Sequence, residues 1–259
     1  MLRAISAKLA QRPELLLMLM AAAVPLSFAA WQALLNNFAI ERAAFTGREM
    51  GILQSLREIP GFLAFGVVFL LAVVREQTLA LLALCLLGIG TALTGFFPSV
   101  TGLYLTTLLM SLGFHYFETL QTSLTLQWID KTRTAETLGR LMATGSLAAI
   151  LTFALIWCGN SFLQIDYRWL YLLFGGLTLM LTLIAWLLFP PFTSRVVQHR
   201  HMLMRRRYWL YYALTFMSGA RRQIFMVFAG FLMVERFGYS VSGIALLFLI
   251  NASINVLFA

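Results

Sequence analysis

The feature that most constrains this chain is a succession of long apolar stretches separated by short charged or turn-forming segments. Hydrophobic side chains make up 61% of its 259 residues and charged ones only 11%, whereas about a quarter of a typical soluble domain is charged. A helix needs about 20 apolar residues to cross the hydrocarbon core of a bilayer. The chain therefore has room for about eight crossings and for no large domain outside the membrane.

Eight apolar stretches meet this requirement. They are Leu15 to Ile40, Gly51 to Val74, Thr78 to Phe97, Gly102 to Trp128, Leu141 to Trp157, Trp169 to Phe189, Tyr208 to Val234 and Val241 to Ala259. Three basic residues precede the first stretch, as in a signal peptide, but its apolar run continues past signal length and favours a permanent crossing. We predict an all-α integral membrane protein.

The basic residues are distributed unevenly between the two sides of the membrane. With the N-terminus in the cytoplasm, twelve lysines and arginines lie inside and four outside. This excess predicts a cytoplasmic N-terminus in a plasma or bacterial inner membrane, and it explains the formal charge of +9 without a nucleic acid partner. The most basic loop, 190–207, is interpreted as a topology determinant, although it also suits contact with anionic lipid headgroups.

The start of the chain is repeated faintly after this basic loop. The pair Glu41 and Arg42 ends the first crossing, and the pair Glu235 and Arg236 ends the seventh, 194 residues later. Many transporter folds consist of two structural copies that show only weak sequence symmetry. The sequence therefore predicts one copy of six crossings followed by the start of a second.

These features resemble the major facilitator superfamily, whose members carry two six-helix bundles joined by a long basic cytoplasmic loop. The resemblance covers the whole chain. It rests on the topology, on Asn36-Asn37-Phe38 at the end of the first crossing and on Gly139-Arg140-Leu141 at the start of the fifth. It implies a bundle at 13–189, a cytoplasmic inter-bundle loop at 190–207, and the first two helices of an incomplete second bundle at 208–259.

The chain departs from the family's pattern at three points. The Gly, Asp, Arg, Gly, Arg signature that many members carry between the second and third crossings is absent, since only Arg75 and Glu76 stand there. Gly145 is followed by Ser146 rather than by the proline of many proton-coupled drug exporters. Members carry twelve crossings, and this sequence stops at Ala259, inside the eighth. We therefore expect a fragment or a truncated form that does not transport alone, rather than a mature protein of eight crossings.

Ionisable side chains inside membrane crossings are costly and usually face a bundle interior or a water-filled cavity. The third and sixth predicted crossings contain none. The second, fourth and seventh carry Arg57 with Glu58, His115 with Glu118, and Arg221 with Arg222. In the family that the chain resembles, the first, second, fourth and fifth helices of each bundle line a central cavity, and the observed distribution matches that division.

The fourth crossing carries the clearest polar stripe. Ser111, His115, Glu118 and Thr122 follow one another at spacings of four, three and four residues, which places them on one helix face. Glu118 is our candidate for a proton-carrying carboxylate, because apolar surroundings favour a protonated carboxyl group. A static polar contact between helices is the alternative. The His-x-x-Glu pair has no third ligand nearby, so neither a metal site nor another cofactor is predicted.

The seventh crossing carries two arginines near mid-membrane, with Ser218 on the same helix. Arg221 and Arg222 either bind an anionic solute, for which guanidinium groups are suited, or pair with Glu58 or Glu118. A third alternative places them lower, at the cytoplasmic edge.

The first two crossings add further candidates for the cavity lining. Arg57 and Glu58 are expected about 9 to 10 Å below the outer boundary as a partly hydrated ion pair, and Glu58 is a second candidate for proton coupling. Trp31, Asn36 and Asn37 offer stacking and hydrogen bonds to a solute.

The leading hypothesis is a secondary transporter that moves a small organic solute by alternating access, coupled to protons, with the lipid bilayer and the solute as partners. A membrane-embedded enzyme needs a nucleophile with its base, or a metal triad, at one depth, and only His115 and Glu118 approach this. We therefore predict that the protein is not an enzyme. A non-transporting membrane subunit or an inactive remnant is the remaining alternative.

Overall fold

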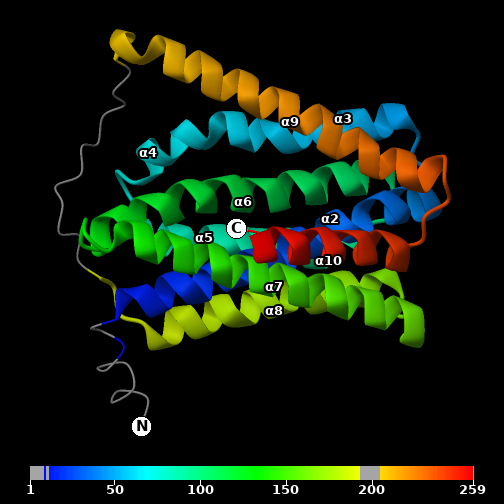
Figure 1. The fold of residues 1–259 in the computed structure, drawn as a ribbon, viewed down its shortest axis with the longest axis horizontal. Coiled ribbons are helices and arrows are strands. Elements are labelled where there is room, and N and C mark those ends of the chain that lie inside the picture. Colours follow the sequence, from blue (N-terminus) through cyan, green and yellow to red (C-terminus); the bar gives the residue numbers. More distant parts are fainter. Residues whose placement is uncertain (1–8, 10–11, 193–204, 259) are drawn as a thin grey trace.

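The computed structural model describes residues 9, 12–192 and 205–258, with side chains for all of these except 215, 216, 218–227 and 258. The described residues form a set of long rods that run along one common direction (Figure 1). Each predicted crossing corresponds to one rod. The rods are α2 (Pro13–Ala43), α3 (Gly47–Phe62) continued by η1 (Leu63–Gly66) and α4 (Val67–Leu70), α5 (Glu76–Thr94), α6 (Val100–Trp128), α7 (Thr134–Leu163), α8 (Tyr167–Leu188), α9 (Trp209–Glu235), preceded by η2 (Arg206–Tyr208), and α10 (Val241–Phe258).

Five of these rods are long and apolar enough to cross a membrane by length and composition, namely α2, α3 with its continuation to Leu70, α5, α7 and α8. The apolar α10 is shorter. The chain is therefore an all-α, multi-pass membrane protein, as the sequence predicted.

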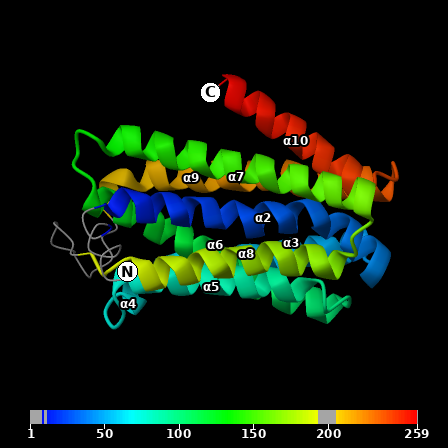
Figure 2. The same ribbon diagram turned by 90° about the horizontal axis from the view of Figure 1, so that it is seen from below.

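The two ends of the rods differ in the segments that they carry. One end, here called the turn end, holds the short turns 44–46, 95–99, 164–166 and 236–240. The other end, called the linker end, holds segments 71–75, 129–133 and 189–192 and the start of α9. The first helix, α2, begins at the linker end (Figures 1 and 2).

Local sequence signals explain where several helices begin and break. Thr46 and Glu49 form a capping box that starts α3, and Ser99 and Asp166 accept hydrogen bonds from the first turns of α6 and α8. The second rod changes to a 3-10 turn at Leu63–Gly66, shortly after Pro60. A proline removes a backbone donor, and a helix commonly bends near it.

Glycines bring three helices of the first bundle into backbone contact. A Cβ atom added to Gly113 of α6 would lie 2.3 Å from the Leu87 nitrogen of α5, and one added to Gly175 of α8 would lie 2.5 Å from the Ala92 nitrogen. Small residues allow such close packing in membranes, where van der Waals contact largely replaces the hydrophobic effect between helices. The paired α5 and α8 lie on the side of the molecule away from α10 (Figure 2).

The turns α2–α3 and α9–α10 share their geometry, which supports the repeat seen in the sequence. Ala44 and Gly238 both adopt positive φ angles, 52° and 66°, and stand 194 residues apart. Two residues later in each turn, Thr46 and Ser240 accept a hydrogen bond from the start of the next helix. The same sequence offset therefore relates matching residues of two structurally similar hairpins.

The helices α9 and α10 lie against the first bundle at the turn end and diverge from it toward the linker end (Figures 1 and 2). Their burial follows this shape. The buried residues described in them lie in the turn-end half, at Phe231, Val234, Val241, Ile244 and Ala245, whereas 205–211 and 254–257 are exposed. Together with the first bundle, the two helices form a V that is closed at the turn end.

Candidate functional site

The predicted cavity residues of α2, α3 and α6 meet near the middle of the first bundle. The Arg57 guanidinium lies 5.8 Å from the centre of the Trp31 ring and donates to Glu58 at 2.6 and 3.0 Å. The Arg57 side chain is largely buried and Glu58 is partly exposed. A cation close to an indole face and beside a carboxylate is partly compensated for its loss of water.

Arg57 and Glu58 lie about three turns into their helix. Their helix starts at Gly47 rather than Gly51, because the cap at Thr46 extends it. Ten residues of helix place Arg57 about 15 Å from the start of α3 at the turn end.

The polar stripe of α6 divides between two neighbours. Ser111 donates a hydrogen bond to the Arg57 carbonyl oxygen, and His115 covers Gly61, where an added Cβ would lie 2.9 Å from the imidazole. These two residues therefore pack against α3. Glu118 and Thr122, nearer the linker end, are exposed and line a different space.

That space is a pocket of about 260 Å³ between α2, α6 and α7. Its polar lining comes from four residues of α6, namely Glu118, Gln121, Thr122 and Thr125. Gly145 of α7 also lines it, and a Cβ added there would lie 3.8 Å from the Pro25 ring of α2. The lining residues belong to the linker-end halves of α2, α6 and α7. The Glu118 carboxylate thus borders a hollow in that half of the bundle.

Asn36 and Asn37 contact the second pair of helices. The Asn37 Nδ2 donates to the Tyr239 carbonyl oxygen at 2.8 Å, and a Cβ added to Gly230 would lie 2.8 Å from the Asn36 Nδ2. Both side chains are buried, with 1% and 8% of Asn37 and Asn36 exposed. In this conformation the two asparagines join the bundles at the turn end.

A hydrogen-bonded group at the same end supports this contact from the first bundle. Glu41 accepts a hydrogen bond from the Tyr167 hydroxyl at 2.8 Å, and the Arg42 guanidinium pairs with Asp166 at 3.1 Å. The Arg168 backbone N–H bonds the Asp166 carboxylate and lowers its pKa, an effect that the neighbouring Arg168 and Arg42 charges reinforce. Asp166 is thus ionised at neutral pH and joins α2 to α8.

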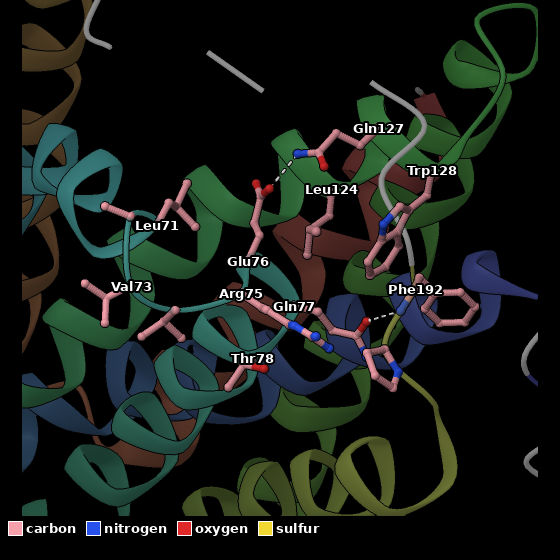
Figure 3. Close-up of a pocket in the computed structure, with 13 residues that line it drawn as sticks. Leu71, Val73, Arg75, Glu76, Gln77, Thr78, Leu124, Gln127, Trp128 and Phe192 are labelled. Carbon is pink, nitrogen blue, oxygen red and sulfur yellow. Dashed lines mark hydrogen bonds between the residues drawn. The ribbon is translucent and has the colours of Figure 1, made fainter. Parts of the chain in front are cut away.

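A second pocket, of about 290 Å³, lies at the linker end beside the start of α5 (Figure 3). The Gln77 carboxamide donates to the Pro190 oxygen at 3.1 Å and accepts from the Phe192 nitrogen at 2.9 Å. The Trp128 and Phe192 rings lie 5.0 Å apart, and Gln127 donates to Glu76 at 2.6 Å. These contacts fix the segment that follows α8 to the first bundle.

The remaining candidates belong to α9. Its backbone is described, but the side chains of Ser218, Arg221 and Arg222 lie outside the described residues. The sequence reasoning missed Glu41, Tyr167 and Gln77, because their partners are distant in the chain and leave no local pattern.

No protein-family model matches the sequence, and no curated protein matches it at a significant level. Solved structures are nevertheless similar in fold. The nucleoside transporter NupG aligns with a TM-score of 0.69 and 15% identity over 95% of this chain and 66% of that one. A bacterial homologue of the human lysosomal transporter Spinster, inward-facing and occupied, aligns with a TM-score of 0.67 and 14% identity over 94% of this chain and 58% of that one.

A peptide transporter of the POT family, in an auto-inhibited form, is also similar, with a TM-score of 0.55 and 17% identity over 93% of this chain and 51% of that one. This chain thus spans no more than about two thirds of the length of these transporters.

The arrangement defines a class of membrane protein, one with a six-helix bundle followed by two helices of a second bundle. The chain has the fold of these solved transporters, which agrees with the resemblance stated from its sequence.

Proposed function

We propose that this protein is a secondary active transporter that moves a small organic solute by alternating access. The V of the first bundle with α9 and α10 is the observation that carries this proposal. A solute site near the membrane midplane is then open toward one end and closed toward the other, as rocking of two bundles requires. The similarity in fold to solved nucleoside and peptide transporters supports the same function.

We propose that the linker end, with the N-terminus, faces the cytoplasm of a plasma or bacterial inner membrane. Among the described residues, the linker end carries Arg75, Lys131, Arg133 and Arg205–Arg207, and the turn end carries Arg42, Arg48, Arg168 and Arg236. Basic residues are retained preferentially on the cytoplasmic side. The V is therefore open inward, with 13–189 as the first bundle, 190–207 as the inter-bundle loop and 208–259 as the start of the second bundle.

The solute pathway is proposed to run along the faces of α2, α3, α6 and α9. Trp31, Arg57, Ser111, His115 and Thr122 would contribute aromatic, cationic and hydroxyl groups. Asn36, Asn37, Ser218, Arg221 and Arg222 complete the proposed lining, and its cationic groups favour an anionic or strongly polar solute.

Glu118 is the proposed proton-coupling carboxylate and Glu58 the second candidate. Glu118 borders the linker-end pocket, so water that enters from that end can exchange protons with its carboxylate. Its charge would then depend on the end of the protein to which the solute pathway is open.

Uptake into proteoliposomes tests the transport proposal. Nucleosides and dipeptides, supplied with and without an inward pH gradient, are the first solutes to try on the product of the whole reading frame. We expect accumulation that depends on the gradient, and at least a tenfold loss of that dependence in Glu118→Gln, with downhill exchange retained.

Glu136→Gln, exposed and paired with Arg140 at the surface, is the matched control. Accumulation that is unchanged in Glu118→Gln would reject the coupling role, and absence of uptake for every solute class would reject transport.

A further inference from the structure

The Asn37 side chain makes the closest polar contact described between the first bundle and the helices that follow it. Its amide group donates to a backbone oxygen 202 residues away, at 2.8 Å, and the residue is almost completely buried. The acceptor is the carbonyl of Tyr239 in the α9–α10 turn. The hydrogen bond between Asn37 and Tyr239 can form only while the turn end is closed, and it must break when that end opens.

Asn37 is held in place from its own bundle. Its Nδ2 also lies 3.5 Å from Glu41, one helical turn further along α2, and Glu41 accepts a hydrogen bond from Tyr167 of α8 at 2.8 Å. These contacts lie within the first bundle and do not depend on α9 or α10. The amide is therefore positioned for Tyr239 before the two bundles meet.

The surrounding surfaces are shaped for repeated separation. Phe231 and Phe228 of α9 rest on Gly47 and Gly51 of α3, with ring atoms 3.8 and 4.0 Å from where a glycine Cβ would stand. These two distances correspond to ordinary van der Waals contact. The backbone of α9 comes closest to the Asn36 side chain at Gly230, because a residue without a side chain leaves room for the amide group.

We infer that Asn37, with Asn36 against Gly230, is a latch that holds the turn end closed, because in this conformation the two asparagines join the bundles. The inference rests on the proposed function, because it assigns the contact that must break in each transport cycle. A neutral hydrogen bond of this kind is weak enough to break and re-form. The latch thus favours the inward-open state without locking it.

Thiol labelling at the turn end tests the latch without any solute. Val241, 3% exposed at the start of α10, is replaced by cysteine in a background with Cys85 and Cys158 changed to alanine. The protein is placed in nanodiscs, where a water-soluble maleimide reaches both faces. We expect Asn37→Leu to increase the labelling rate about fivefold, which corresponds to the loss of one neutral hydrogen bond. The control Thr94→Val, at the turn end of α5, removes a buried hydroxyl that bonds the Gly90 oxygen of its own helix and should leave the rate unchanged.

A second pair of variants opens the latch sterically. Gly230→Ala places a methyl group 2.8 Å from the Asn36 amide and should also increase labelling, whereas Gly47→Ala meets Phe231 at 3.8 Å and should not. Unchanged labelling in both Asn37→Leu and Gly230→Ala would overturn the latch. Uptake measured separately on the same proteins distinguishes this outcome from a failure of the transport proposal, because labelling requires no solute.

Discussion

A covalent bond across the turn end is expected to stop transport. Cysteines at positions 36 and 230 replace Asn36 and Gly230, whose side-chain nitrogen and virtual Cβ lie 2.8 Å apart. Oxidation then joins α2 to α9 and holds the V open toward the linker end only. Because each cycle requires these helices to separate, uptake should fall by more than about tenfold and should recover on reduction. Gel mobility after protease cleavage of the inter-bundle loop measures the cross-linked fraction.

The matched control joins two helices that should move together. Ser27 donates to Thr178 at 2.8 Å, and both lie inside the first bundle, on α2 and α8. A disulfide between cysteines at these two positions should leave uptake within about twofold of the reduced protein, because the bundle rocks as a unit. Transport that survives a complete cross-link at 36 and 230 would contradict alternating access at this end.

The second large effect is expected in the packing of the first bundle. Gly175→Ala places a methyl group 2.5 Å from the Ala92 nitrogen and the Gly88 oxygen, both backbone atoms of α5. Backbone cannot yield as a flexible side chain can, so α5 and α8 must separate, and we expect a loss of about 3 kcal/mol in the free energy of unfolding. Thermal unfolding in detergent, followed by size-exclusion chromatography of the heated sample, measures the loss.

The next residue provides the comparison. Gly176→Ala adds the same methyl group on the same helix, where nothing lies within 4 Å. Alanine is a better helix former than glycine, so this variant should equal or exceed the wild type in stability, by up to about 1 kcal/mol. Equal destabilisation by the two substitutions would show that the loss of glycine itself, rather than helix contact, is responsible.

The sequence predicted the crossings and their grouping well, because both depend on local patterns. Apolar length located each rod, and the pair Glu41 and Arg42 with its copy at 235–236 indicated the repeated hairpin. The start of the second helix was placed at Gly51 because hydropathy alone located it. The capping box of Thr46 and Glu49 is visible in the sequence and would have placed that start at Gly47.

The partners of the polar residues could not be predicted from the sequence. Helical spacing places Ser111 and Glu118 on one face, but a face about 11 Å long can contact different helices along its length. Ser111 packs on α3, while Glu118 borders the pocket with α2 and α7. Asn37 was assigned to a solute because its type suits one. Its contact with Tyr239, 202 residues away, follows only from the three-dimensional arrangement.

The central claim is that α9 and α10 rock against the first bundle about a point between the two ends. Distances between spin labels at both ends test it most directly. One pair is placed at Ala135 and Leu257, exposed at the linker ends of α7 and α10, and the other at Phe162 and Tyr239, exposed at the turn end. Pulsed electron resonance on the wild type and on Gly230→Ala should show the turn-end distance lengthening as the linker-end distance shortens. Distances that stay constant, or that lengthen together, would contradict the account.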